Sequence, residues 1–280
     1  MTDWYLTVDG GGTGMRLGVY VGDSMTPRTK LELDVPGSLT LGVERSVDGI
    51  TQGIERLRST YEGMEQPPRH IQCGLAGSLE PSRLGRFLQQ WHGQAIDVVT
   101  DGYGQLIGAT QGRPGACMSV GTGSVVHWLD ESGYSGMAGG WGFPVGDLGG
   151  GAQLGLCWLQ LELMTFDQQG PSDLLVQLIG EHKADIQAWC AHATATEFAA
   201  LCPAIIAATD NASAVAAVTR AQAALDELVA VVPAHLPRFV AGALGVVLCQ
   251  YQPGFRVSDG SALEGLRRIQ LGSAPKEVMR

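Results

Sequence analysis

The sequence predicts an α/β protein made of two similar halves, because one short pattern occurs twice along the chain. In each copy an apolar, strand-like run enters a glycine-rich turn, and a second apolar run leaves it. The first turn is Asp-Gly-Gly-Gly-Thr at residues 9–13, and the second is Gly-Thr-Gly-Ser at residues 121–124. Helix-like and strand-like segments alternate after the first turn, as they do in α/β domains. We therefore expect two related domains that face each other across a cleft.

The elements of the first half follow from apolar periodicity and from breaks at glycine and proline. Residues 43–61 predict a helix, because apolar residues recur there at the spacing of one helix face. Further helices are expected at residues 81–91 and from 101 through 108, and strands at residues 5–8, 17–21, 30–34, 71–76 and 96–100. Gly-Arg-Pro-Gly at 112–115 then interrupts the pattern. We place the domain boundary there, which gives an N-terminal domain of residues 1–112 and a C-terminal domain of residues 113–280.

The second half starts again with expected strands at residues 116–120, 125–128 and 135–139. A glycine-rich segment follows, and then an Ala/Leu-rich stretch, residues 152–232, which predicts helices broken at Gly170-Pro171 and near Cys202-Pro203. A late strand at 238–242 leads into a Gly-x-x-Gly turn and an apolar helix. The last predicted element is a short helix at 261–270, which we expect to pack on the N-terminal domain.

Composition excludes several classes of protein. The net charge of −10 disfavours a nucleic-acid partner, because phosphate contacts need a basic face. No apolar run reaches the ~18 residues of a membrane span, and the N-terminus has no charged segment followed by an apolar core. The six cysteines form no CxxC pair and mostly lie in apolar stretches. They predict reduced core thiols in a cytoplasmic protein.

The two turns predict phosphate binding when they are taken together. Glycine lets backbone N–H groups point into a turn with no Cβ in the way, which suits phosphate oxygens. Each turn alone is also explained as a plain hairpin, since Asp-Gly between alternating apolar residues favours one. Neither turn is a P-loop, because no Gly-Lys-Ser/Thr is present, and the first turn leads into a strand, unlike a dinucleotide fingerprint. The pair of turns favours a protein that holds a nucleoside triphosphate.

The order of these segments resembles the superfamily of sugar kinases, actin and heat-shock-chaperone ATPases. Residues 9–13 match its first phosphate motif, residues 119–124 its second, and residues 240–243 its adenosine turn. Within that superfamily, residues 139–151 resemble the branch of N-acetylglucosamine and glucosamine kinases, which also holds the BadF/BcrA-type ATPases. Thr-Asp-Gly-Tyr-Gly at 100–104 and the segment 258–265 look closest to bacterial glucosamine kinases.

This resemblance implies an actin-like ATPase fold, in which two ribonuclease-H-like α/β domains hold ATP in the cleft between them. It also implies Mg²⁺ as a cofactor, a small amino sugar as the other substrate, and the possibility of a homodimer. Asp101 would be the general base, and Asp9 would hold Mg²⁺ through water. The residues implied to bind ATP and its phosphates are Gly11, Gly12, Thr13, Gly121, Thr122, Gly123, Ser124, Gly242 and Ala243. Those implied to bind the sugar are Ser38, Thr40, Asp101, Gly139, Gly140 and Asp147.

The residues by themselves leave plainer interpretations open. Asp101 could be a helix N-cap, since it follows an apolar strand and opens a helix. Asp9 could be the turn residue of a hairpin, and Asp147 a loop residue that bonds its own backbone. His127 is expected to be an ordinary, partly buried strand histidine, and Trp141 is assigned no role.

Two departures from the resembled pattern concern the substrate. Leu148 stands where the branch usually has an acidic residue, and the loop of residues 37–42 lacks the Asn usual in bacterial glucosamine kinases. The expected function is nonetheless ATP-dependent phosphorylation of a hydroxyl of glucosamine or N-acetylglucosamine, giving the 6-phosphate. The alternatives are a BadF-type activator ATPase with an iron–sulfur cluster, and a sugar or nucleotide sensor without catalysis.

Overall fold

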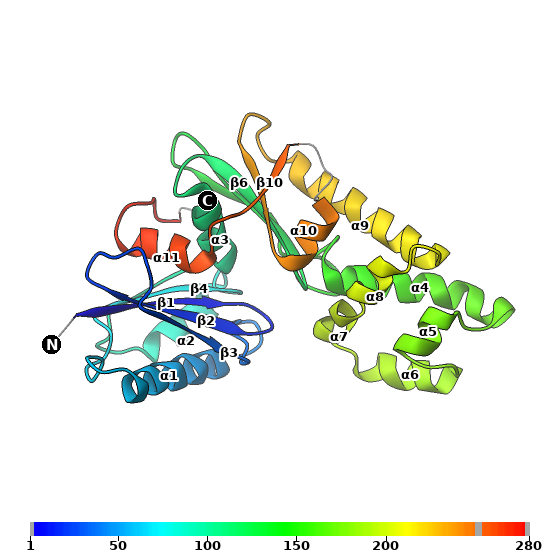
Figure 1. Cartoon of the computed structure of the whole chain (residues 1–280), viewed down its shortest axis with the longest axis horizontal. Helices are drawn as coiled ribbons and strands as arrows, with labels where there is room; N and C mark the ends of the chain where they lie inside the picture. The colour runs from blue at the N-terminus through cyan, green and yellow to red at the C-terminus, as the bar shows by residue number, and fades with distance from the viewer. Residues whose placement is uncertain (1–2, 250–253, 278–280) are drawn as a thin grey trace. The chain divides into compact units, whose positions relative to one another are not determined.

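The computed structural model describes residues 3–249 and 254–277 (Figure 1). In those residues the strands form two five-stranded sheets, of order β3-β2-β1-β4-β5 and β10-β9-β6-β7-β8. The strands of the first sheet are β1 (Trp4–Gly10), β2 (Met15–Val21), β3 (Thr29–Leu33), β4 (Ile71–Leu75) and β5 (Ile96–Val99). Those of the second are β6 (Gly115–Val120), β7 (Ser124–Leu129), β8 (Ser135–Gly139), β9 (Arg238–Ala241) and β10 (Phe255–Val257).

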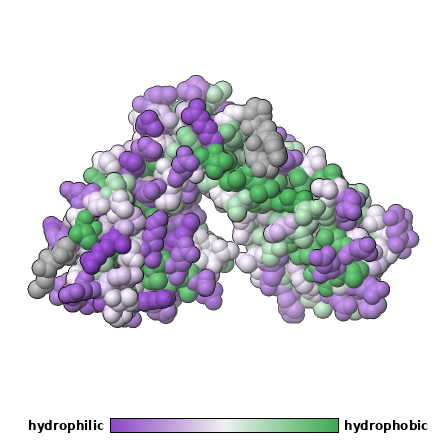
Figure 2. Space-filling model, viewed as in Figure 1, coloured by the Kyte–Doolittle hydropathy of each residue, from purple (hydrophilic) through white to green (hydrophobic). Residues whose placement is uncertain are grey.

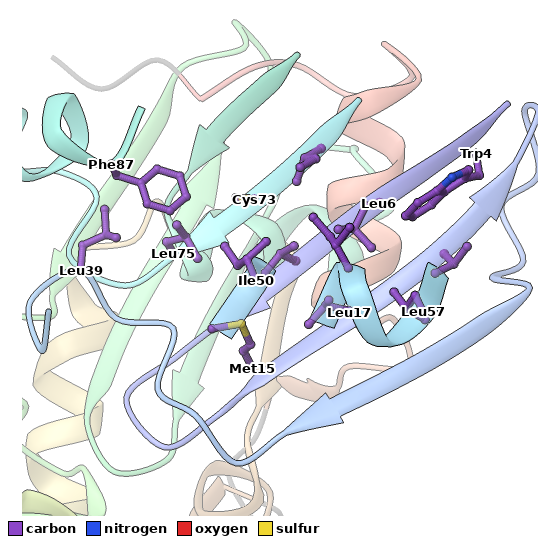
Figure 3. Packing of buried hydrophobic residues seen from close by; sticks show 14 of the residues in the cluster. Trp4, Leu6, Met15, Leu17, Leu39, Ile50, Leu57, Cys73, Leu75 and Phe87 are labelled. Atoms are coloured by element: carbon purple, nitrogen blue, oxygen red, sulfur yellow. The ribbon is translucent and has the colours of Figure 1, made fainter. Parts of the chain in front are cut away.

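The first sheet is mixed: β1 pairs antiparallel with β2 and parallel with β4. One face packs against α1 (Val43–Thr60) and α2 (Pro81–Gln89), whose apolar sides join the core cluster of Figure 3. This core includes Leu6 and Leu17 from the sheet and Ile50 from α1, all fully buried. Alternating apolar residues on the strands and i, i+3/i+4 apolar residues on α1 explain why these elements pair.

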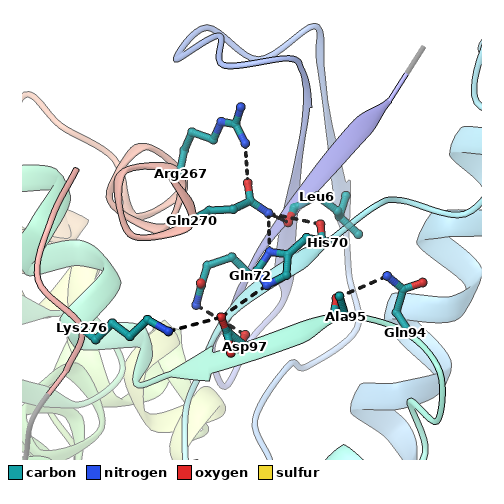
Figure 4. A network of polar contacts seen from close by, with 9 residues as sticks. All are labelled: Leu6, His70, Gln72, Gln94, Ala95, Asp97, Arg267, Gln270 and Lys276. Carbon is teal, nitrogen blue, oxygen red and sulfur yellow. Dashed lines mark hydrogen bonds and ion pairs between the residues drawn. The ribbon is translucent and has the colours of Figure 1, made fainter. Parts of the chain in front are cut away.

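A second pair of helices contacts the same sheet: α3 (Asp101–Thr110) and α11 (Ala262–Gln270). The side-chain amide of Gln270 donates to the carbonyl oxygens of Leu6 (3.2 Å) and His70 (3.1 Å), which fastens α11 to β1 and to the residue before β4 (Figure 4). Ser261 caps α11 in a capping box with Glu264.

A run of helices lies in the sequence between β8 and β9 of the second sheet. They are α4 (Gly151–Gln169), α5 (Asp173–Leu178), α6 (Lys183–His192), α7 (Ala195–Ala200), α8 (Cys202–Ala207) and α9 (Ala212–Ala230), with α10 (Ala243–Cys249) after β9. No single helix among the described residues is long and apolar enough to cross a membrane. A bent pair, α7–α8 with α9, meets that test on length and composition alone. On the face seen in Figure 2, hydrophilic side chains are interspersed with apolar ones over this helical region.

The described chain forms two compact units. Unit one comprises residues 3–117, 127–136 and 258–277, and unit two comprises residues 118–126, 137–249 and 254–257. The division into domains at residues 112 and 113 stays a prediction.

Most predicted elements lie within two residues of those observed. The strand β10 was not predicted, because it has three residues, two of them exposed, and so gives no apolar signal. The expectation that the cysteines are core thiols is right for four of the six; Cys190 on α6 is exposed and Cys157 on α4 is half-buried.

Candidate active site

The first candidate group is a carboxylate that follows the edge strand β5. Thr100 is the N-cap of α3, since its Oγ1 accepts a hydrogen bond from the N–H of Tyr103 (3.2 Å). Asp101 is the first helical residue and does not fill the cap position. The interpretation of Asp101 as an N-cap is therefore wrong, because Thr100 already supplies that hydrogen bond.

Asp9 lies near Asp101 across a single strand. The partner of Asp9 in the parallel register with β4 is Gly74, and a Cβ on Gly74 would lie 3.4 Å from the Cα of Asp101. Burial raises the pKa of Asp101 to about 6, and the nearby Asp9 carboxylate adds to the rise. A nearby negative charge disfavours ionisation, so the Asp9 carboxylate helps to hold the pKa of Asp101 above its ordinary value.

Arg16 is the cross-strand partner of Asp9, and sequence analysis missed it. Its Nη2 lies 2.5 Å from Oδ2 of Asp9, which is only 7% exposed. Burial raises the pKa of Asp9, and the Arg16 guanidinium opposes that rise. The available signal was the hairpin itself, since residues at equal distances from a turn face each other in an antiparallel pair.

The first glycine turn has free space beside its glycines Gly11 and Gly12. The N–H of Gly11 donates to the carbonyl oxygen of Gly14 (3.1 Å), and the turn's Gly12 and Thr13 are exposed. A Cβ added at Gly11 or Gly12 would meet no atom within 4 Å, and neither residue has a positive φ. Neither packing nor backbone conformation thus requires glycine at these two positions. Their residue type is explained if a ligand approaches the backbone there.

The predicted sugar loop is fastened to the first turn and to β4. The N–H of Gly37 donates to the carbonyl oxygen of Gly11 (2.9 Å), and the N–H of Leu39 donates to that of Ala76 (2.8 Å). Within this loop Ser38 is buried and Thr40 is exposed. The structure therefore brings the loop, the first turn, Asp9 and Asp101 together in unit one.

In unit two, the second glycine turn joins β6 to β7 and caps a helix. The carbonyl oxygens of Gly121 and Thr122 accept hydrogen bonds from the N–H groups of Gly151 (2.8 Å) and Ala152 (2.9 Å), the first residues of α4. This supplies partners for two amides that a helix start otherwise leaves unpaired. The hydroxyl of Ser124 donates to the carbonyl oxygen of Leu148 (2.7 Å). The Ser124 hydroxyl therefore donates its single proton to a group of the protein itself.

Asp147 lies against this second turn. Its Oδ1 accepts from the N–H of Gly142 (3.0 Å), and its Oδ2 occupies the space that a Cβ on Gly123 would need. The expectation that Asp147 forms a hydrogen bond with the backbone of its own loop is therefore confirmed. The role of Asp147 in sugar binding stays a prediction. Burial raises the pKa of Asp147. Gly139 and Gly140 lie in the same loop with φ of 79° and 68°, which favours glycine there without a ligand.

The predicted adenosine turn also packs beside the second phosphate turn. Gly242 links β9 to α10 with φ of 86°, and a Cβ there would overlap the carbonyl oxygen of Val120, which precedes Gly121. Ala243 begins α10 and is exposed. The structure thus places the two unit-two motifs side by side.

His127 differs from its expectation, because it is buried instead of partly buried. It is 3% exposed, lies on β7, and burial lowers its pKa to about 4. Its Nε2 lies 3.3 Å from Oγ1 of Thr100, the cap of the helix that carries Asp101. Sequence gave no signal for this pairing, since the two residues come from different elements 27 positions apart.

The residues of unit one fit Mg²⁺ held through water. Among the described residues, no three His, Cys, Asp or Glu side chains form a cage for a metal. Mg²⁺ does not need one, because it usually retains several waters and binds one or two carboxylates together with phosphates. The electrostatic coupling of Asp9 and Asp101 provides carboxylates of that kind.

Comparisons with known proteins find similarity to two amino-sugar kinases. Glucosamine kinase from Vibrio cholerae is 33% identical over 187 residues, which are 64% of this chain and 61% of that protein. N-acetyl-D-glucosamine kinase from Dictyostelium discoideum is 31% identical over 145 residues, covering 48% of this chain and 45% of the relative. The chain thus spans less than two thirds of each of these relatives. No protein-family model matches it.

A solved structure covers nearly the whole chain. It is a provisionally assigned N-acetylglucosamine kinase from Chromobacterium violaceum, with a TM-score of 0.84, 29% identity, and coverage of 95% of this chain and 98% of that one. The chain is thus similar in sequence and in fold to proteins named as amino-sugar kinases. The predicted α/β fold of the actin-like ATPase type is confirmed. A second neighbour, from Porphyromonas gingivalis, shares the fold at a TM-score of 0.69 and 18% identity.

Proposed function

We propose that this protein transfers the terminal phosphoryl group of ATP to a hydroxyl of a small amino sugar, glucosamine or N-acetylglucosamine, giving the 6-phosphate. The observation that carries the proposal is the carboxylate of Asp101. It stands at the N-terminus of α3, the cap of that helix is supplied by Thr100, and burial with Asp9 nearby raises its pKa to about 6. The similarity to two amino-sugar kinases supports the substrate class.

Asp101 would act as the general base. A base works best when its pKa lies near the working pH, because it is then ionised and still able to hold the proton it receives. With a pKa of about 6, most of the Asp101 population is ionised at pH 7. It would accept the proton of the sugar hydroxyl as that oxygen attacks the phosphorus.

The phosphates would be held by backbone N–H groups of the two turns. In unit one these would come from Gly12 and Thr13, with Gly11 beside them, because the N–H of Gly11 already donates to Gly14. In unit two they would come from Thr122 and Gly123, because the N–H of Gly121 already donates to Gly123, with Gly242 and Ala243 beside the turn for the adenosine. Mg²⁺, held through water by Asp9, would neutralise charge on the phosphates. Fixed donors of this kind lower a barrier because they need no rearrangement during reaction.

The sugar would contact the loop that contains Ser38 and Thr40, and the loop that contains Gly139, Gly140 and Asp147. Ser38 and Thr40 offer hydroxyls, and Asp147 offers a carboxylate that accepts from sugar hydroxyls. A cytoplasmic location and a homodimer are further predictions that accompany this proposal.

The proposal is tested by measuring ADP release from Mg-ATP with glucosamine, N-acetylglucosamine, glucose and mannosamine in turn. We expect turnover that depends on an amino sugar, with the product identified as the 6-phosphate. The Asp101→Asn variant is the matched control, because it keeps the shape of the side chain and removes the base. The proposal is overturned if no sugar raises ADP release, or if the variant is as fast as the parent.

A further inference from the structure

A segment near the end of the chain contacts the N-terminus of α3 directly. The backbone N–H of Thr100 donates to Oε2 of Glu277 (2.8 Å), and the Thr100 hydroxyl donates to Oε1 of the same side chain (2.7 Å). Two residues earlier, the carbonyl oxygen of Pro275 accepts from the hydroxyl of Tyr103 (3.0 Å). The carboxylate of Glu277 is thus bound by both hydrogen-bond donors of the residue that precedes Asp101.

The Thr100 hydroxyl connects this contact to His127. Its single proton is directed to Glu277, so toward Tyr103 N–H and His127 Nε2 it acts as an acceptor. The tautomer of His127 that fits has its proton on Nε2. His127 Nδ1 is then a bare acceptor, buried and without a hydrogen-bond partner. An unpaired buried acceptor has a free-energy cost, which indicates that the ring is retained for its position.

His127 also fixes the residue on the other side of Asp101. The ring lies against Gly102 so closely that a Cβ at that position would overlap Cε1 and Nδ1 of His127. Asp101 is therefore flanked by Thr100, which Glu277 and His127 hold, and by Gly102, which packs on the same ring. Both neighbours of the carboxylate are held by groups from outside α3.

We propose that Glu277 and His127 are positioning residues that hold Asp101 in the orientation required for catalysis. The inference rests on the proposed role of Asp101 as base. Charge-assisted hydrogen bonds that a carboxylate accepts from groups at a helix N-terminus are strong and favoured by the helix dipole. Small displacements of a catalytic group reduce rates steeply, since the reacting atoms must meet at about 3 Å.

The test of Glu277 uses a conservative variant and a neighbouring control. Glu277→Gln keeps the length of the side chain but has only one accepting oxygen in place of two. We expect kcat to fall by about tenfold while KM for ATP stays within about twofold, because the groups proposed to bind ATP are untouched. Lys276→Gln is the control: Lys276 is largely exposed and lies 3.9 Å from Asp97, on β5 (Figure 4), and its loss leaves kcat unchanged.

His127 is tested by rescue. His127→Ala removes the donor to Thr100 and leaves space beside Gly102, so kcat falls with KM unchanged. His127→Gln places an amide N–H near the position of Nε2, and we expect it to recover part of the lost kcat. A purely structural role predicts instead that melting temperature, kcat and both KM values worsen together in all these variants.

The outcomes separate this inference from the proposed function. A parent protein that turns over sugar, together with a Glu277→Gln variant of unchanged kcat, overturns the role of Glu277 alone. Parallel losses in stability, kcat and KM overturn the positioning role of both residues. An Asp101→Asn variant that retains full kcat overturns the proposed function, whatever Glu277 does.

Discussion

The two glycine turns have the same sequence pattern but different surroundings. In unit one, Gly11 and Gly12 have open space where a side chain would project. In unit two, the turn caps α4 through two carbonyl oxygens, and Gly123 packs against the carboxylate of Asp147. The first turn therefore closes the hairpin and holds the loop of residues 37–42 through the carbonyl oxygen of Gly11, whereas the second turn caps a helix and packs against the loop of Asp147. A shared motif does not imply that each of its residues is present for the same reason.

The largest effect is expected from the carboxylates near the turns. Asp101→Asn should lower kcat by 10²-fold or more, as loss of a general base does. Asp147→Asn should lower kcat/KM for the sugar by less, because the amide still offers an oxygen to Gly142 and to a hydroxyl. Steady-state kinetics on both variants decides which carboxylate is the base. A greater loss of kcat in Asp147→Asn would reverse the assignment.

The next largest effects are expected from substitutions of the turn glycines. Gly123→Ala should lower the melting temperature by several degrees and reduce turnover, because its Cβ overlaps Asp147 Oδ2. Gly12→Ala should leave the melting temperature unchanged and raise KM for ATP, since its Cβ enters only the space proposed for phosphate. Thermal melts and ATP titrations check both. Equal KM values for Gly12→Ala and the parent would remove the argument for phosphate at the first turn.

The pH dependence of activity and of stability tests the assignment of Asp101 as the general base. Activity should fall as pH drops through about 6, where Asp101 becomes protonated. The same raised pKa means that the folded state prefers protonated Asp101. Its contribution to stability is present below the unfolded value of about 4 and is lost as pH rises through about 6. Asp101→Asn should therefore become more stable relative to the parent as pH rises from about 4 to about 6, and the difference should stay constant at higher pH. If the difference in melting temperature between Asp101→Asn and the parent does not change with pH, the raised pKa of Asp101 is contradicted.

The smallest effect concerns the hydroxyls. Ser124→Ala should lower stability by about 1 kcal/mol, because it removes the bond to the Leu148 carbonyl. Thr13→Ala, on the exposed first turn, should leave stability unchanged and weaken ATP binding slightly. Denaturant titrations distinguish the two variants. If Ser124→Ala keeps its stability and loses ATP affinity, the serine binds phosphate as the sequence resemblance implies.

The sequence predicted the fold and the motifs well because both depend on local patterns. Apolar periodicity marks α1 and β1, and Gly-rich runs mark the turns. The partners of the site residues could not be predicted, since they come from distant parts of the chain. Arg16 pairs with Asp9 because the register of β1 and β2 places the two residues opposite each other. Glu277 contacts Thr100 although 177 positions separate them in the sequence. The sequence left open whether Asp101 caps α3, because Thr100 and Asp101 are both good caps and only the structure identifies Thr100 as the cap.

The path of the chain through unit one has a consequence for biosynthesis. Residues 258–277 belong to unit one but are made after all the residues of unit two. Until these residues have been made, α3 lacks both α11 and the carboxylate of Glu277. Translation must therefore reach residue 277 before the helix that carries Asp101 has its full set of contacts. The order of synthesis delays completion of the candidate base until the last part of this chain emerges.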